Sequence, residues 1–175
     1  MTILMPEELV RAKQLMYNAK FEEALKIIEN LEKKETLTPN DQLSTLSLKG
    51  RIYSYNEQYR NAVKIGGLLY ELCQELGNLP KSIDALVLKS YTGDTTIALK
   101  LILEAEKVLN SIEGIPNLDL SMQRVEILSR KSRLHFHMGK LDSAVESAKQ
   151  CLFSLEKRGK KLEIGSNFHH FGYIY

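Results

Sequence analysis

The 175-residue chain has no tryptophan, only two cysteines and four prolines, and no long apolar run. A helix that spans a bilayer needs about 20 consecutive apolar residues, so the sequence predicts no transmembrane segment. Its first residues, MTILMPEELVRAK, place Pro6, Glu7 and Glu8 where a signal peptide would continue its apolar stretch. We therefore expect a cytoplasmic protein.

Cysteine is too scarce for a disulfide scaffold. Cys73 and Cys151 lie within helical apolar patterns and have no CxxC spacing. Free cysteine is among the residue types most often buried, so we expect both to be reduced thiols in the core. A pairing between the two stays open at this point.

An excess of one charge is also missing. Lysine and arginine number 24 against 22 for aspartate and glutamate, which leaves a formal net charge of +2. A dedicated nucleic-acid-binding domain is usually far more basic. The charge balance therefore argues against nucleic acid as a partner and names no other partner.

Apolar residues recur at helical spacing along almost the whole chain, and no segment alternates as a strand would. Helix-breaking residues gather in four short clusters, which are ETLTPND (35–41), GNLP (77–80), TGD (92–94) and GIPNLD (114–119). The stretches between these clusters are long enough for helices of three to five turns. The sequence therefore predicts an all-α fold.

A phrase centred on an alanine recurs four times. The alanines are 38, 36 and 46 residues apart, at Ala24, Ala62, Ala98 and Ala144. Twelve residues before each of them stands Ala12, Gly50, Leu86 or Ser132. Three of these four are small, and small residues let two helices cross closely. The pattern predicts a repeated antiparallel helix hairpin.

This pattern resembles the tetratricopeptide repeat (TPR) family, whose units are helix hairpins of 34 residues or slightly more. Beside the small residues and alanines, the likeness covers the large residues Leu15 and Tyr53 and the aromatic residues Phe21 and Tyr59. The third unit departs from the pattern with Leu86, Lys89 and Thr95. The leucine that the family carries before the small residue is replaced by Arg11, Lys49 and Lys131.

The resemblance implies a right-handed α-α superhelix, a solenoid of antiparallel hairpins in one repeat domain over residues 1–175. We expect units at about 6–36, 41–77, 80–113 and 120–159, with a partial unit at 160–175. The last of these ends in NFHHFGYIY, with Gly172 standing 40 residues after Ser132. We interpret it as the first helix of a fifth unit, with packing residues Phe168, Phe171 and Tyr175.

Such an open helix leaves two alternatives. Either the chain is the N-terminal part of a longer array, or a second chain covers the apolar flank and makes a homodimer.

The motifs of familiar active sites are missing. The histidines are adjacent (His169, His170) or two apart (His135, His137), whereas a pair that binds zinc on a helix needs a spacing of four. No GxSxG, GxxxxGK[ST] or GxGxxG occurs. We therefore expect no metal, no cofactor and no enzymatic activity, and we interpret Gly66 and Gly67 as close helix packing inside the second unit.

One set of cations and aromatic residues keeps fixed offsets from the four positions that stand twelve residues before the repeat alanines. It is named here the cation–aromatic column and comprises Lys13, Tyr17, Arg51, Tyr55, Tyr91, Arg133 and His137, with Arg130, one turn before Arg133, added to the same patch. Residues four apart share a helix face. In the TPR family this face of the first helices lines the concave groove that binds peptides. The alternative is that the aromatic residues merely cover the helix ends.

We therefore predict a scaffold or adaptor that binds a protein or peptide, and an acidic one is favoured because arginine forks match carboxylates. On this basis alone, Arg51→Ala and Arg133→Ala are expected to weaken binding and to leave stability unchanged. A helical-repeat RNA-binding module is the alternative, because basic residues interleaved with tyrosines can follow a phosphate backbone. Self-association through the C-terminal helix is a further alternative.

Overall fold

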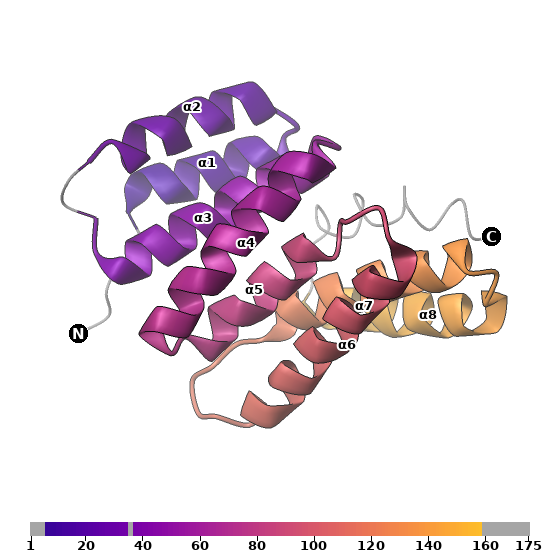
Figure 1. The fold of residues 1–175 in the computed structure, drawn as a ribbon. Coiled ribbons are helices and arrows are strands. Elements are labelled where there is room, and N and C mark those ends of the chain that lie inside the picture. The colour runs from indigo at the N-terminus through magenta and orange to yellow at the C-terminus, as the bar shows by residue number, and fades with distance from the viewer. Residues whose placement is uncertain (1–5, 35–36, 159–175) are drawn as a thin grey trace. The chain divides into compact units, whose positions relative to one another are not determined.

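The computed structural model describes residues 6–34 and 37–158 (Figure 1). Within these ranges it contains eight helices and no strand, so the predicted all-α class is confirmed. The helices are α1 (Glu7–Tyr17), α2 (Phe21–Glu32), α3 (Pro39–Tyr55), α4 (Tyr59–Leu76), α5 (Leu79–Lys89), α6 (Thr95–Ile112), α7 (Ser121–His137) and α8 (Leu141–Arg158). Phe168, Phe171 and Tyr175 lie outside the described residues.

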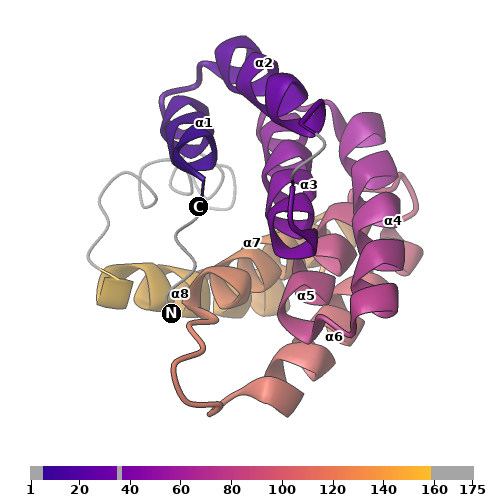
Figure 2. The ribbon, with the colours of Figure 1, turned by 90° about the vertical axis from the view of Figure 1, so that its left-hand side faces the viewer.

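The chain divides into two compact units, Met1–Tyr91 and Thr92–Tyr175. In the first unit α1 packs against α2, α3 against α4, and α5 against both α3 and α4; in the second, α7 packs against α6 and α8 (Figures 1 and 2). The division falls between α5 and α6, inside the predicted third hairpin. The superhelix and the unit boundaries expected from the sequence stay predictions.

Three of the predicted breaker clusters start helices through side-chain caps. Thr38 accepts a hydrogen bond from the backbone N–H of Asp41 at 3.2 Å, and Pro39 follows it in the first turn of α3. Asn78 caps α5 at 3.0 Å and Asp94 caps α6 at 2.9 Å in the same way. Each cap satisfies a backbone donor that has no partner within its own helix, which fixes where the helix begins.

The same backbone turn closes three hairpins. The N–H of Lys20 donates to the carbonyl of Leu15 at 2.9 Å, and equivalent bonds join Gln58 to Tyr53 and Lys140 to His135. The residue before each donor has a positive φ, namely Ala19 (57°), Glu57 (57°) and Gly139 (71°). This is the Schellman ending of a helix. It recurs at matching places in the predicted units.

The small residues lie where helices meet. Ala12, Ala24, Ala62 and Ala144 have no exposed surface. In the second unit the hydroxyl of Ser132 on α7 donates to the carbonyl of Ala144 on α8 at 2.8 Å, which joins the two positions that the repeat pattern paired. These contacts agree with the predicted role of small residues at helix crossings.

Gly66 and Gly67 behave differently, although they are neighbours. A Cβ atom on Gly66 would lie 2.9 Å from Cβ of Leu88 and 2.9 Å from the backbone N of Lys89, so α4 and α5 touch there through their backbones. The close packing predicted for this residue is present, but its partner is α5 and not a helix of the second predicted unit. Gly67 has nothing within 4 Å of such an atom, so for Gly67 the packing interpretation is wrong.

The two cysteines are buried and free, as predicted, with Cys73 in the first unit and Cys151 in the second. Burial, aided by the charge of Asp84, raises the pKa of the Cys73 thiol to about 11. Burial alone raises the pKa of Cys151 to about 12. Both are therefore protonated near neutral pH and act as small apolar side chains.

The contrast between the glycines gives the first prediction. Gly66→Ala forces α5 to shift, and we expect it to lower the free energy of unfolding by about 1–3 kcal/mol. Gly67→Ala adds a methyl group in open space and removes a poor helix former, so it should raise that free energy by about 0.5–1 kcal/mol. Urea unfolding of the two variants beside the wild type measures both changes. Equal effects would contradict the close approach of α4 and α5.

Candidate binding surface

The cation–aromatic column begins with a direct contact on α1. The Nζ atom of Lys13 lies 5.9 Å from the centroid of the Tyr17 ring, so the cation and the aromatic face meet as the spacing of four predicts. Tyr17 and Tyr55 are both half-buried and pack against the core formed by α1, α2 and α3. Both residues are therefore packed partly into the core and stay partly accessible to solvent.

Tyr91 is not presented in the same way. Its ring stacks on that of Tyr59, at the start of α4, with centroids 5.2 Å apart and planes inclined by 5°. A stacked pair of this kind stabilises packing by about 0.5–1.5 kcal/mol beyond its buried area. The structure thus gives Tyr91 the role of covering the beginning of a neighbouring helix, which was the alternative interpretation for the aromatic members of the column.

Arg51 takes part in a buried charge network that sequence reasoning missed. Its Nη2 atom lies 3.1 Å from Oδ1 of Asp84, a carboxylate on α5 whose residue is only 2% exposed. The other oxygen, Oδ2, accepts hydrogen bonds from Ser47 Oγ at 2.7 Å and from Lys81 Nζ at 3.1 Å. Donors from both α3 and α5 therefore share one carboxylate.

Opposing effects act on this carboxylate. Burial alone would raise the pKa of Asp84, but the charges of Arg51 and Lys81, together with the hydrogen bond from Ser47, outweigh it and hold the pKa below its usual value. Asp84 is therefore ionised near neutral pH. Removing a cation from a buried pair leaves an uncompensated charge, which is strongly destabilising.

This finding changes the expectation for Arg51. Its guanidinium group holds α5 on α3 through Asp84, so Arg51→Ala will lower stability as well as any binding. Arg51 is thus a positioning residue for Asp84, and its substitution cannot by itself identify a binding face.

The second unit carries the last three members of the column. Arg130 and Arg133 on α7 are half-buried, and His137 at the end of α7 is exposed, with its ring edge-on to Phe136 at 5.9 Å. His135, two residues before His137, is half-buried. Its Nδ1 atom is shielded from solvent and has no hydrogen-bond partner in the described part of the chain.

A second set of contacts recurs between consecutive helices. Lys49 on α3 pairs with Glu32 on α2 at 2.6 Å, and Lys131 on α7 pairs with Glu106 on α6 at 2.8 Å. Both lysines stand immediately before a small residue, and both glutamates stand eight residues after a repeat alanine. Tyr70 on α4 also stands eight residues after a repeat alanine, Ala62. The Nζ atom of Lys89 on α5 lies 4.3 Å from the centroid of the Tyr70 ring.

These contacts fall at two places where the sequence departs from the TPR resemblance. Lys49 and Lys131 stand where that resemblance predicts leucine, and an acidic residue of the preceding helix faces each of them. The signal was present in the sequence as a lysine and a glutamate at fixed offsets from the repeat positions. It was missed because each residue alone is typical of a solvated helix surface.

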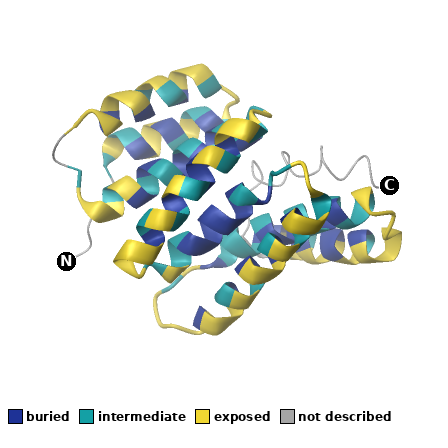
Figure 3. Cartoon of the chain, in the orientation of Figure 1, coloured by how far each residue is buried: buried dark blue, intermediate teal, exposed yellow. Residues whose placement is uncertain are grey.

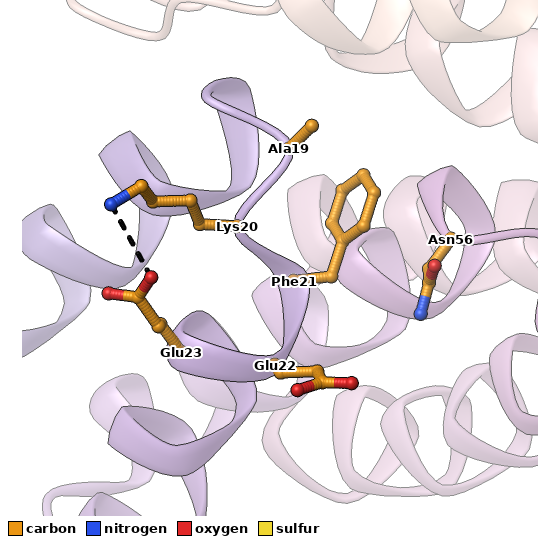
Figure 4. A pocket seen from close by; sticks show the side chains of 6 residues that line it. All are labelled: Ala19, Lys20, Phe21, Glu22, Glu23 and Asn56. Atoms are coloured by element: carbon orange, nitrogen blue, oxygen red, sulfur yellow. Dashed lines mark ion pairs between the residues drawn. The ribbon is translucent and has the colours of Figure 1, made fainter.

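A surface pocket lies at the turn between α1 and α2 (Figure 4). Its lining residues are Ala19, Lys20, Phe21, Glu22, Glu23 and Asn56, and Lys20 pairs with Glu23 at 3.4 Å. The lysine and both glutamates are exposed. None of the polar groups is buried and directed into the hollow, so the pocket has the character of a surface depression.

No protein-family model matches the chain, and a search of curated proteins gives no match. Across residues 6–34 and 37–158, no three histidine, cysteine, aspartate or glutamate side chains converge as metal ligands would. None of the helices in the same ranges is long and apolar enough to cross a membrane.

Asp84 gives the second prediction. The pKa of Asp84 is lower in the folded state than in the unfolded state, where it is about 3.8. The ionised carboxylate therefore contributes its full stability at pH values above the unfolded-state pKa, and this contribution is lost as the pH falls through the folded-state pKa. At pH 7, Asp84→Asn should therefore lower the free energy of unfolding by about 1.5–3 kcal/mol, the range for hydrogen bonds to a charged group.

The difference in the free energy of unfolding between Asp84→Asn and the wild type should shrink as the pH falls from 5 toward 2. Urea unfolding at several pH values measures it, with Asp142→Asn, an exposed aspartate on α8, as the matched control. A difference that stays constant down to pH 2 would show that the charge of Asp84 does not contribute.

Proposed function

We propose that this chain is a TPR-like scaffold that binds an extended acidic peptide, or an acidic segment of a partner protein, along its first helices. The observation that carries the proposal is the half-exposed cation–aromatic contact of Lys13 with Tyr17 on α1, together with Arg133 and His137 at the same offset on α7. We place this activity in the cytoplasm.

The repeat character is supported by contacts that recur at matching offsets. The Schellman endings after α1, α3 and α7 match, and so do the lysine contacts between consecutive helices. In a repeat protein each hairpin packs against its neighbours only, which leaves one face of the first helices uncovered. Each first helix would then carry its own members of the column on such a face.

The chemistry of the column favours a carboxylate-bearing ligand. Guanidinium groups form charge-assisted, forked hydrogen bonds with carboxylates, and tyrosine adds flat apolar area with little loss of side-chain entropy. Arg51 is already paired with Asp84, so its main contribution to the surface is to hold α5 against α3. Within the column, Lys13 on α1 and Arg133, with its neighbour Arg130, on α7 are the cations that we propose for direct contact with the ligand.

The third prediction tests this surface with a variant that carries Arg130→Ala and Arg133→Ala. Fluorescence anisotropy with a pool of labelled glutamate- and aspartate-rich peptides should show affinity reduced by about 1–4 kcal/mol relative to the wild type. The matched control, Lys100→Ala with Lys149→Ala, removes the same charge from exposed places on α6 and α8 and should bind as the wild type does. Thermal melting confirms that both variants are folded.

Two results would contradict the proposal. One is equal binding by the wild type, the arginine variant and the lysine control. The other is a preference for single-stranded RNA with affinity that falls steeply as salt rises, which would support the RNA-binding alternative.

A further inference from the structure

The solvent-facing side of α4 carries charges in an unusual order. Arg60 and Lys64 occupy its N-terminal half, and Glu71 and Glu75 its C-terminal half. This order opposes the helix dipole, which favours acidic residues near the N-terminus and basic residues near the C-terminus. None of the four side chains forms an ion pair or hydrogen bond with the rest of residues 6–34 and 37–158, so the unit itself does not use them.

A glycine and an exposed leucine lie between these charges. Gly67 stands in the middle of the 18-residue helix, and no atom lies within 4 Å of the place where its side chain would be. Leu68 beside it is 47% exposed. Glycine is a poor helix former, and neither its conformation nor a close neighbour within the unit requires it here.

Helix geometry makes this face complementary to itself. Successive residues are about 100° apart around the axis, so Arg60, Lys64, Gly67, Glu71 and Glu75 fall within an arc of about 80°. A twofold axis that passes between Gly67 and Leu68 brings Arg60 of one copy opposite Glu75 of the other. The same operation brings Lys64 opposite Glu71, and it sets Gly67 level with Leu68 on opposite edges of the contact.

We infer that α4 is a homodimer interface, in which two copies of the helix pair antiparallel across this twofold axis. The two Leu68 side chains lie side by side on one edge of the contact, the two Gly67 residues lie on the other edge, where they let the backbones approach, and four ion pairs flank this centre. The exposed side of α4 in Figure 3 is the surface concerned. The inference is independent of the peptide-binding proposal, because no residue of the cation–aromatic column takes part.

The dimer should be weak. One pair of 18-residue helices buries less than the roughly 1,200–2,000 Å² of a standard protein interface, so we expect a dissociation constant in the micromolar range. Because both copies contribute the same surface to the interface, a single substitution changes two of the ion pairs. Charge reversal at one residue therefore places two pairs of like charges in the interface.

The fourth prediction is a charge-swap experiment on the full chain. Sedimentation equilibrium from about 1 to 500 μM, a range that brackets the expected affinity, should show the wild type approaching twice its 20.0 kDa mass. Lys64→Glu and Glu71→Lys should each weaken association by about tenfold or more, because like charges then face each other. The double variant Lys64→Glu/Glu71→Lys should restore it.

Two controls complete the experiment. Lys100→Glu and Glu104→Lys alter exposed residues four apart on α6 and should leave association unchanged. Phe168→Glu with Phe171→Glu tests the C-terminal alternative and should also leave it unchanged. Circular dichroism verifies the helical content of every variant.

A monomer mass at all concentrations would overturn the inference. So would a dimer that both single reversals leave intact, a double variant that stays as weak as the singles, or loss of the dimer on substitution of Phe168 and Phe171.

Discussion

A helix hairpin has an apolar flank that its own two helices cannot cover, and the first unit depends on how the following helix is held against that flank. On the hairpin of α3 and α4 this helix is α5. It meets the backbone of α4 at Gly66 and that of α3 through Leu88, which lies against Gly50. It also brings the carboxylate of Asp84 to Ser47 and Arg51 of α3. Shape complementarity and a buried charge thus act at the same contact.

The two kinds of contact have different roles. Glycine and alanine let the helices approach closely, so that the larger leucine and isoleucine side chains around them are buried, and this apolar packing has no directional bonds that fix the position of a helix. A buried carboxylate held by Ser47, Arg51 and Lys81 tolerates little displacement, because each lost hydrogen bond leaves a desolvated charge. Lysine contacts such as Lys49 with Glu32 are more exposed and contribute less. We therefore regard Asp84 as the group that fixes the position of α5.

Much of the fold could be predicted from local patterns. The helical period, the capping residues Asn78 and Asp94 and the buried alanines all follow from short-range rules that the sequence displays openly. The turns at Ala19 and Glu57 could not be recognised in this way, because neither residue is the glycine that usually marks a left-handed conformation. Both residues are exposed, and the Schellman hydrogen bonds of the helix ends accompany that conformation.

The candidate surface was harder to predict, because it depends on residues distant in sequence. Asp84 appears in SIDALVLK as one polar residue among apolar ones, while its partners Ser47 and Arg51 lie 37 and 33 residues away. Nothing local indicates that Arg51 pairs with a buried carboxylate, or that Tyr91 stacks on Tyr59. The column is thus divided by the structure. Arg51 and Tyr91 hold helices together, and the other members remain the candidates for contact with a ligand, namely Lys13, Tyr17, Tyr55, Arg130, Arg133 and His137.

Native-state hydrogen exchange on the full chain tests most directly whether α5 is an integral part of the first unit. If packing at Gly66 and the carboxylate of Asp84 hold it as described, the amides of α3, α4 and α5 will exchange through one cooperative opening with a common free energy. Rapid exchange of the α5 amides, while those of α3 and α4 stay protected, would contradict the account.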